Sequence, residues 1–246
     1  MIANTQSIVL RAVKFGETSI ISTQFTRLFG VQAYLIRGVR TTSPKGRNNK
    51  AGLLQPATLL DITCYQKPQS NLHRLNEFSL TKVYSNIYEE ILRNSIAIFS
   101  VELLLRLLPE AAPMPEFFDF AQTYFLNLDE TAIDNLGNFP LFFVLQASRA
   151  LGYELSGTWT EDTPYLNLLQ GSFSVYSPTG GTVVTTEDAK ALAALMELHF
   201  FRELGTVKMN AAMRFRLLEW FLEFLRCHTE HMSQLKSLQV LKAVLH

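Results

Sequence analysis

The residues best suited to chemistry in this sequence are cations gathered in its first third. Residues 1–80 contain ten Lys or Arg against three acidic residues, a balance of 10 − 3 = +7, so the remainder carries −7 in a chain of zero formal net charge. Such a bipolar distribution favours binding of a polyanion by the first part and repulsion by the second. The candidate phosphate ligands are Arg11, Lys14, Arg27, Arg37, Arg40, Lys45, Arg47 and Lys50.

Part of this charge lies in a long insertion between expected strands, residues 39–55. The insertion has four cations, no acidic residue and almost no apolar side chain before Leu53. A segment of this composition buries too little apolar surface to order itself. We expect it to become ordered on binding.

Two tyrosines are candidates for stacking on nucleic-acid bases. Tyr34 and Tyr65 each lie on the more polar side of an expected strand, beside basic residues. Aromatic side chains on such a face stack with successive bases of a single strand. The alternative is that both tyrosines cover the rim of a barrel. We include Tyr34 among the expected DNA-binding residues.

Motifs for catalysis or a bound cofactor are missing from the sequence. It contains no phosphate-binding Gly-rich loop followed by Lys-Ser/Thr, no GxSxG and no HExxH. Cys227 and His231 have a spacing that metal sites use, but a structural zinc needs four ligands and the other histidines are scattered. We therefore expect no enzyme activity, no cofactor and no metal.

Short β-branched and aromatic segments dominate the first 80 residues. The expected strands are 7–15, 18–25, 31–37, 58–65 and 72–78, with Gly16 and Gly30 at turns. Alternation predicts that Val31, Ala33 and Leu35 share one face, and that Leu60, Ile62 and Cys64 share one face. Five short strands predict a barrel of the OB type, although an SH3-like barrel would have a similar pattern.

Helical periodicity begins near residue 83. Expected helices start near Ile87, Pro115, Leu141, Ala189, Ala211 and Leu235, with Thr185 and Asp188 as a capping box and Gly152 after a helix end. A Gly- and Pro-rich stretch at about 153–184 interrupts them with two β-like pieces. The fold class is α+β: an N-terminal five-stranded OB-type β-barrel domain, 1–80, followed by an all-α domain, 81–246, with a small β insertion.

Targeting features place the chain in the cytoplasm. The N-terminus lacks the pattern of a signal peptide, and no apolar run is long enough to span a membrane. Cys64 and Cys227 could form a disulfide on paper, but reduced cysteines in an intracellular protein are the favoured interpretation.

An ordered series of short stretches resembles the RecO family of bacterial recombination mediators. The series is Thr5-Gln6-Ser7-Ile8-Val9-Leu10-Arg11, Gly16-Glu17-Thr18-Ser19-Ile20-Ile21, Phe25-Thr26-Arg27, Arg37-Gly38-Val39-Arg40, Leu54-Gln55-Pro56 and Leu59-Leu60-Asp61-Ile62. The helical part matches more loosely, through Phe117-Phe118-Asp119-Phe120, Arg149-Ala150-Leu151-Gly152-Tyr153 and Leu235-Lys236-Ser237-Leu238.

The resemblance departs at one place. Many members of that family carry a four-cysteine zinc module after the Leu-Gly-Tyr segment, but residues 153–184 here contain no Cys or His. The insertion would then be a degenerate form of that module. We expect it to be held by packing of Trp159, Tyr165, Leu168, Phe173 and Tyr176.

The resemblance implies a nucleoid-associated protein of DNA repair and recombination. It would bind single- and double-stranded DNA, anneal complementary strands, and act with RecR to load RecA onto DNA coated by single-strand-binding protein. The family also holds the tail of single-strand-binding protein in its helical part. A desolvated terminal carboxylate needs a cation beside an apolar pocket, and Arg93 and Arg149 are the candidates.

Other function classes fit the sequence less well. An OB-fold RNA-binding protein would have the same barrel and basic loop, and RNA of equal length would distinguish it through the 2′-hydroxyl. A hydrolase or transferase lacks a constellation of catalytic residues. A structural adaptor would show no affinity for an oligonucleotide.

Overall fold

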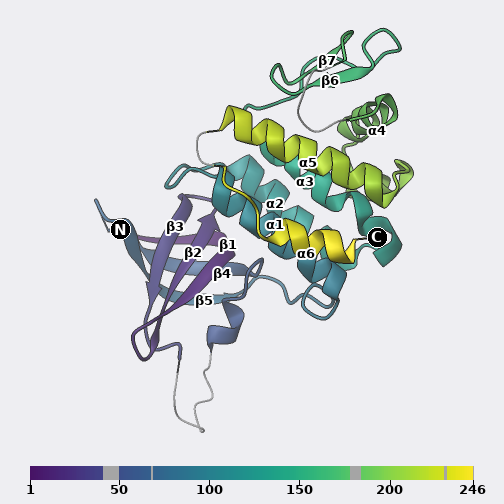
Figure 1. Cartoon of the computed structure of the whole chain (residues 1–246). Helices are drawn as coiled ribbons and strands as arrows, with labels where there is room; N and C mark the ends of the chain where they lie inside the picture. The colour runs from purple at the N-terminus through teal and green to yellow at the C-terminus, as the bar shows by residue number, and fades with distance from the viewer. Residues whose placement is uncertain (41–49, 68, 178–183, 230–231, 246) are drawn as a thin grey trace. The chain divides into compact units, whose positions relative to one another are not determined.

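The computed structural model describes residues 1–40, 50–67, 69–177, 184–229 and 232–245 (Figure 1). The chain forms two compact units: Met1–Tyr84 with Leu108–Leu126, and Ser85–Leu107 with Asn127–His246. This division differs from the expected one at residue 80, chiefly because residues 108–126 cluster with the barrel. Most of the basic insertion, residues 41–49, lies outside the described residues.

Five strands in the first unit close into a barrel (Figure 1). They are β1 (Ile2–Phe15), β2 (Ser19–Thr26), β3 (Gly30–Ile36), β4 (Leu59–Tyr65) and β5 (Leu72–Leu80). Their order round the barrel is β1-β2-β3-β5-β4, and all neighbours are antiparallel except β3 and β5. This confirms the OB-type barrel and all five expected strands.

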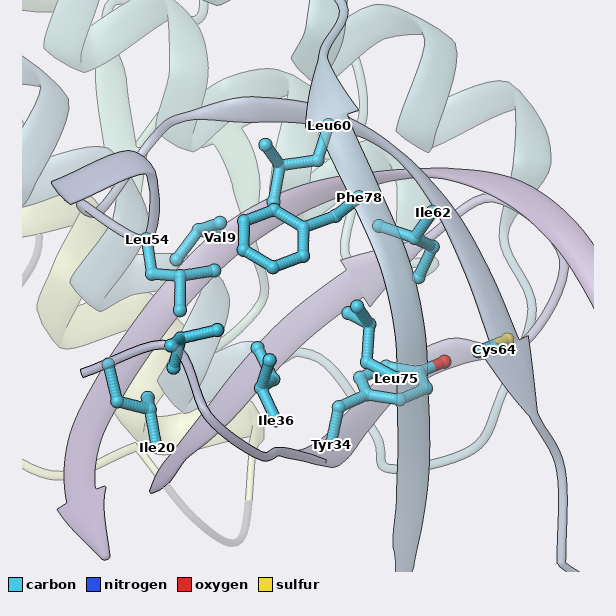
Figure 2. Close-up of a cluster of buried hydrophobic side chains, with 11 residues drawn as sticks. Val9, Ile20, Tyr34, Ile36, Leu54, Leu60, Ile62, Cys64, Leu75 and Phe78 are labelled. Carbon is cyan, nitrogen blue, oxygen red and sulfur yellow. The ribbon is translucent and has the colours of Figure 1, made fainter. Parts of the chain in front are cut away.

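Apolar side chains from every strand fill the barrel. Figure 2 shows that Leu60, Ile62 and Cys64 of β4 join this interior, which confirms the predicted alternation of that strand. The short 3-10 helix η1 (Lys50–Leu53) precedes Leu54, which packs against the same cluster. Cys64 and Cys227 are both free thiols, and Cys64 is buried.

Val31, Ala33 and Leu35 share one face of β3, as predicted, but it is the outer face of the barrel. Tyr34 and Ile36 point into the barrel, as Figure 2 shows, and Leu35 lies on the outside. Val31 is buried as well, because the backbone N–H of Ala111 donates to its carbonyl at 2.9 Å and covers the outer face there. The more polar side of the strand, on which the sequence places Tyr34, is therefore the side that faces the barrel interior.

Segment 108–126 packs on the barrel through aromatic contacts. It contains most of helix α2 (Pro115–Glu130), and the ring of Phe25 lies 6.2 Å from that of Phe117 and 5.4 Å from that of Phe118. Gly30, at φ +67°, allows the close approach, since a Cβ there would stand 2.2 Å from the carbonyl oxygen of Ala112.

The second unit is helical. It contains α1 (Ile91–Leu107), α3 (Phe139–Ala150), α4 (Thr186–Met196), α5 (Ala211–His228) and α6 (Ser237–Val244), with short helices η2 (Ile133–Asn138) and η3 (Phe201–Thr206). Helix α1 contacts α3 and α6, and α3 contacts α5. The expected capping box of Thr185 and Asp188 begins α4, and Gly152 follows the end of α3 at φ +83°.

A small hairpin interrupts the helices, as expected. Strands β6 (Tyr165–Asn167) and β7 (Ser172–Ser174) pair antiparallel, and Leu166 and Phe173 are buried. Packing of Tyr176 was expected, but its side chain is 82% exposed because the chain has already left the hairpin. Phe173 is buried as expected, and Leu155 and Leu166 are buried with it.

In the described part of the chain, no helix has the length and apolar character needed to cross a membrane.

Candidate nucleic-acid interface

One outer face of the barrel combines exposed apolar side chains with unpaired cations. The strand register places Val13, Ile21 and Leu35 side by side on β1, β2 and β3. Val13 is 45% exposed, and Ile21 and Leu35 are partly exposed. This row lies on the side opposite the barrel interior, because its neighbours Ile20 and Ile36 are core residues.

Three arginines border the row. In the strand register, Arg11 lies opposite Thr23 of β2, next to the row, and Arg74 of β5 lies opposite Leu35. Arg37 follows the end of β3. All three are exposed, and none forms an ion pair within the described residues. Their guanidinium groups are therefore available to phosphate oxygens.

Two exposed aromatic rings complete this surface. Phe15, at the end of β1, is 52% exposed. Tyr65 on β4 is 41% exposed and lies opposite Arg74 in the strand register. Exposed aromatic rings beside arginines are the arrangement on which single-stranded bases stack. We call this surface the cationic face; its residues are Arg11, Val13, Phe15, Ile21, Leu35, Arg37, Tyr65 and Arg74.

Sequence reasoning found part of this face and missed the rest. Arg11 and Arg37 were expected, and Tyr65 was considered. Phe15 and Arg74 were missed, although their exposure follows once the register of β1 and β5 is known.

The other predicted barrel cations have different surroundings. Lys14 is exposed at the end of β1. It lies opposite Ile20 in the strand register and is not part of the Val13 row. Arg40 donates to the carbonyl of Gly16 at 3.1 Å, and the ammonium of Lys50 lies 5.5 Å from the ring of Phe78. Lys45 and Arg47 lie outside the described residues.

Arg27 is engaged within the protein. Its Nε and Nη2 donate to the two carboxylate oxygens of Asp119 at 2.7 and 2.9 Å. A bidentate pair of this kind fixes the guanidinium in place. Arg27 therefore fastens α2 to the barrel, whereas the sequence suggested a phosphate ligand.

The expectation that Tyr34 stacks on bases is wrong, because its ring is fully buried in the barrel (Figure 2). The hydroxyl of Tyr34 donates to Oε1 of Gln32 at 2.9 Å, and Nε2 of Gln66 donates to the same oxygen at 2.8 Å. Burial raises the pKa of Tyr34, with a further contribution from the nearby thiol of Cys64. The ring is thus a core residue with a neutral hydroxyl.

Comparison with known families gives matches over almost the whole chain. The family model described as "Recombination protein O N terminal" matches residues 1–84, and "Recombination protein O C terminal" matches residues 88–239. The chain belongs to the RecO family.

Several relatives with this family name align over nearly their full length. The DNA repair protein RecO of Bacteroides fragilis is 29% identical over 243 residues, covering 98% of both chains. Those of Flavobacterium psychrophilum and Christiangramia forsetii are each 28% identical, covering 98% and 99% of both chains.

In this RecO chain, Arg93 does not lie at the lip of a pocket as expected. It is buried, its Nε donates to Glu90 at 2.7 Å, and its Nη1 donates to the carbonyl of Leu128. The side chain is directed inward because a buried guanidinium must find acceptors to replace water. The expectation for Arg93 is therefore wrong.

Arg149, the other expected ligand of a partner's tail, is 40% exposed at the end of α3. Its Nε donates to Glu154 at 2.8 Å. The adjoining crevice, lined by Leu145, Met196 and Phe221 among others, has a volume of only about 10 Å³. A ligand there would have to displace Glu154 and open the crevice.

Metal-binding residues are dispersed in the described part of this RecO chain. No group of three His, Cys, Asp or Glu residues among the described ranges could hold a metal ion. Cys227 is exposed, and a ring nitrogen of its neighbour His228 lies 3.3 Å from the carbonyl of Leu168. His231 lies outside the described residues.

Proposed function

We propose that this RecO-family chain binds DNA through the cationic face and serves in DNA repair and recombination. The observation that carries the proposal is the row of Val13, Ile21 and Leu35 bordered by Arg11, Arg37 and Arg74. Membership of the family, and relatives named DNA repair protein RecO, support the choice of DNA over other polyanions.

The chemistry of the face suits both single and double strands. The arginines pair with phosphates of either, and this contact is independent of sequence. In a single strand, the bases stack on Phe15 and Tyr65 and cover the apolar row. Two strands held mainly by their phosphates keep base edges free for pairing, so the protein anneals complementary strands.

Family membership and charge support the proposed partners. The chain acts by binding rather than catalysis, and joins RecR to load RecA onto DNA coated by single-strand-binding protein. Residues 81–246 carry the −7 balance, which disfavours their contact with DNA and suits contact with proteins. Arg149 remains the proposed cation for the tail of single-strand-binding protein.

The test measures affinity for a single-stranded oligonucleotide against salt concentration. Replacing Arg11, Arg37 and Arg74 by Ala should lower the affinity and reduce the salt slope by about 0.7 for each lost phosphate contact. Phe15→Ala should weaken binding by about tenfold and leave the slope unchanged, because stacking releases no counterions.

Controls come from the helical unit. Arg226→Ala removes one exposed cation from α5, and Phe200→Ala removes a similarly exposed ring. Neither should change the affinity. An unchanged salt slope in the triple variant would refute the face, and tighter binding of RNA than of DNA of equal length would favour an RNA-binding protein. Loss of strand annealing in the triple variant is the functional readout.

A further inference from the structure

A polar pocket of about 260 Å³ adjoins the cationic face. Thr23 and Ala33 line it, and these residues lie beside Arg11 in the same cross-strand row. The other walls come from β3, from the turn before β5 and from the segment after α1. They are formed by Val31, Gln32, Ser70, Asn71, His73, Glu110 and Ala111.

Gln32 lines this pocket, and two hydrogen bonds hold its side-chain amide in one orientation. Its Oε1 accepts from the hydroxyl of Tyr34 and from Nε2 of Gln66, at 2.9 and 2.8 Å. These two bonds fix which end of the amide is the oxygen, and Nε2 has no partner within the described residues. An amide held in this way has little freedom to lose when a ligand binds.

The charge of the pocket argues against a phosphate ligand. Nδ1 of His73 accepts from the backbone N–H of Lys67 at 3.2 Å, and burial, with Lys67 nearby, lowers the pKa of His73. His73 is therefore neutral near pH 7. Glu110 is the one formally charged residue among the described lining residues, and its carboxylate would repel a phosphate.

An exocyclic amino group is a suitable ligand for that carboxylate. Acidic side chains accept hydrogen bonds from the amino group of cytosine, and amide side chains read the edge of adenine. The volume lies just below the roughly 300 Å³ at which pockets for drug-sized ligands begin, so it suits a smaller flat ring.

We propose that this pocket receives one nucleobase of a strand bound on the cationic face and favours a base with an amino group. Nε2 of Gln32 donates to a ring nitrogen or carbonyl of the base, and the carboxylate of Glu110 accepts from its amino group. Cytosine and adenine offer both groups, whereas thymine has no amino group. This inference rests on the proposed DNA binding and adds a preference to it.

The test compares oligo(dC) with oligo(dT) of equal length at neutral pH and fixed salt, by fluorescence anisotropy. The wild-type protein should bind oligo(dC) about tenfold more tightly. Glu110→Ala should bring the ratio of the two affinities close to one. Glu116→Ala removes another exposed carboxylate, from α2, and should keep the ratio; it controls for the general gain in positive charge.

A second variant tests the same pocket independently of Glu110. Asn71→Ala changes an exposed side chain on a different wall and should also reduce the ratio, with an unchanged melting temperature as the check of folding. Equal wild-type affinity for the two oligonucleotides would overturn the pocket and leave the DNA-binding proposal intact. An unchanged ratio of the two affinities in Glu110→Ala would also overturn the pocket proposal. Failure to bind either oligonucleotide would instead refute the DNA-binding proposal.

Discussion

Arg27 and Asp119 form a bidentate ion pair that joins the end of β2 to helix α2 across 92 residues of sequence. The two hydrogen bonds from Arg27 hold the pKa of Asp119 below its ordinary value, and burial opposes them only in part. Both side chains are partly exposed, so the geometry of the pair matters more than its electrostatic energy. Its role is to fix α2 on the barrel beside the contacts of Phe25.

We predict that Arg27→Gln lowers the melting temperature but leaves the salt slope of single-strand binding unchanged. The guanidinium is engaged with Asp119, so its removal costs an internal contact and no phosphate contact. Arg37→Gln should have the opposite pattern, with a reduced slope and an unchanged melting temperature. A slope reduced by about 0.7 in Arg27→Gln would show that Arg27 contacts phosphate after all.

Asp188 should make the helical unit sensitive to acid. Its buried carboxylate accepts from Arg216 at 2.7 and 2.8 Å and from the backbone N–H of Thr185, and these bonds lower its pKa although burial opposes them. We predict that Asp188→Asn lowers the free energy of unfolding by about 2–3 kcal/mol at pH 7, measured by urea denaturation.

The sign of the pH dependence follows from the lowered pKa of Asp188. The stabilisation is complete above the unfolded-state pKa of about 3.9 and is lost as pH falls through the lower folded-state pKa. The stability difference between wild type and Asp188→Asn should therefore shrink below about pH 4. Glu187→Gln, an exposed neighbour in the same helical turn, should differ little from wild type at any pH. A constant difference down to the lowest pH would contradict this assignment.

We predict that the purified protein holds no stoichiometric zinc. Residues 153–184 contain no Cys or His, and the β6–β7 hairpin is held by burial of Leu155, Leu166 and Phe173. Elemental analysis should find well under one zinc per chain, and a chelator should leave the melting temperature unchanged. One zinc per chain would direct attention to Cys227 and His231.

For the proposed partner tail, we predict that Arg149→Glu lowers affinity for a peptide with the acidic, apolar C-terminus of single-strand-binding protein. Reversal of the charge places a carboxylate where the terminal carboxylate of the peptide would bind. Calorimetry should show the loss, while affinity for naked DNA stays unchanged. Lys208→Glu, an exposed cation of the same unit, is the matched control. Equal peptide affinity in wild type and Arg149→Glu would place the tail elsewhere.

The sequence by itself determined the features that depend on near neighbours in the chain. The five strands, the alternation of Leu60, Ile62 and Cys64, the capping box of Thr185 and Asp188, and the turn at Gly152 follow from local periodicity and backbone preference. The concentration of cations in residues 1–80 is a property of composition and needs no structure. Arg11 and Arg37 could be selected on that basis.

Tertiary structure alone decided which side chains are free. Residues 110–111 cover the outer end of β3, so Val31 is buried from outside while Tyr34 points inward, and alternation could not reveal this. Arg27 is held by a carboxylate 92 residues away, and Arg93 by a carbonyl 35 residues away. The pocket of Gln32 and Glu110 likewise joins segments far apart in the chain. Burial and ion pairing depend on distances in space, and only folding brings these groups together.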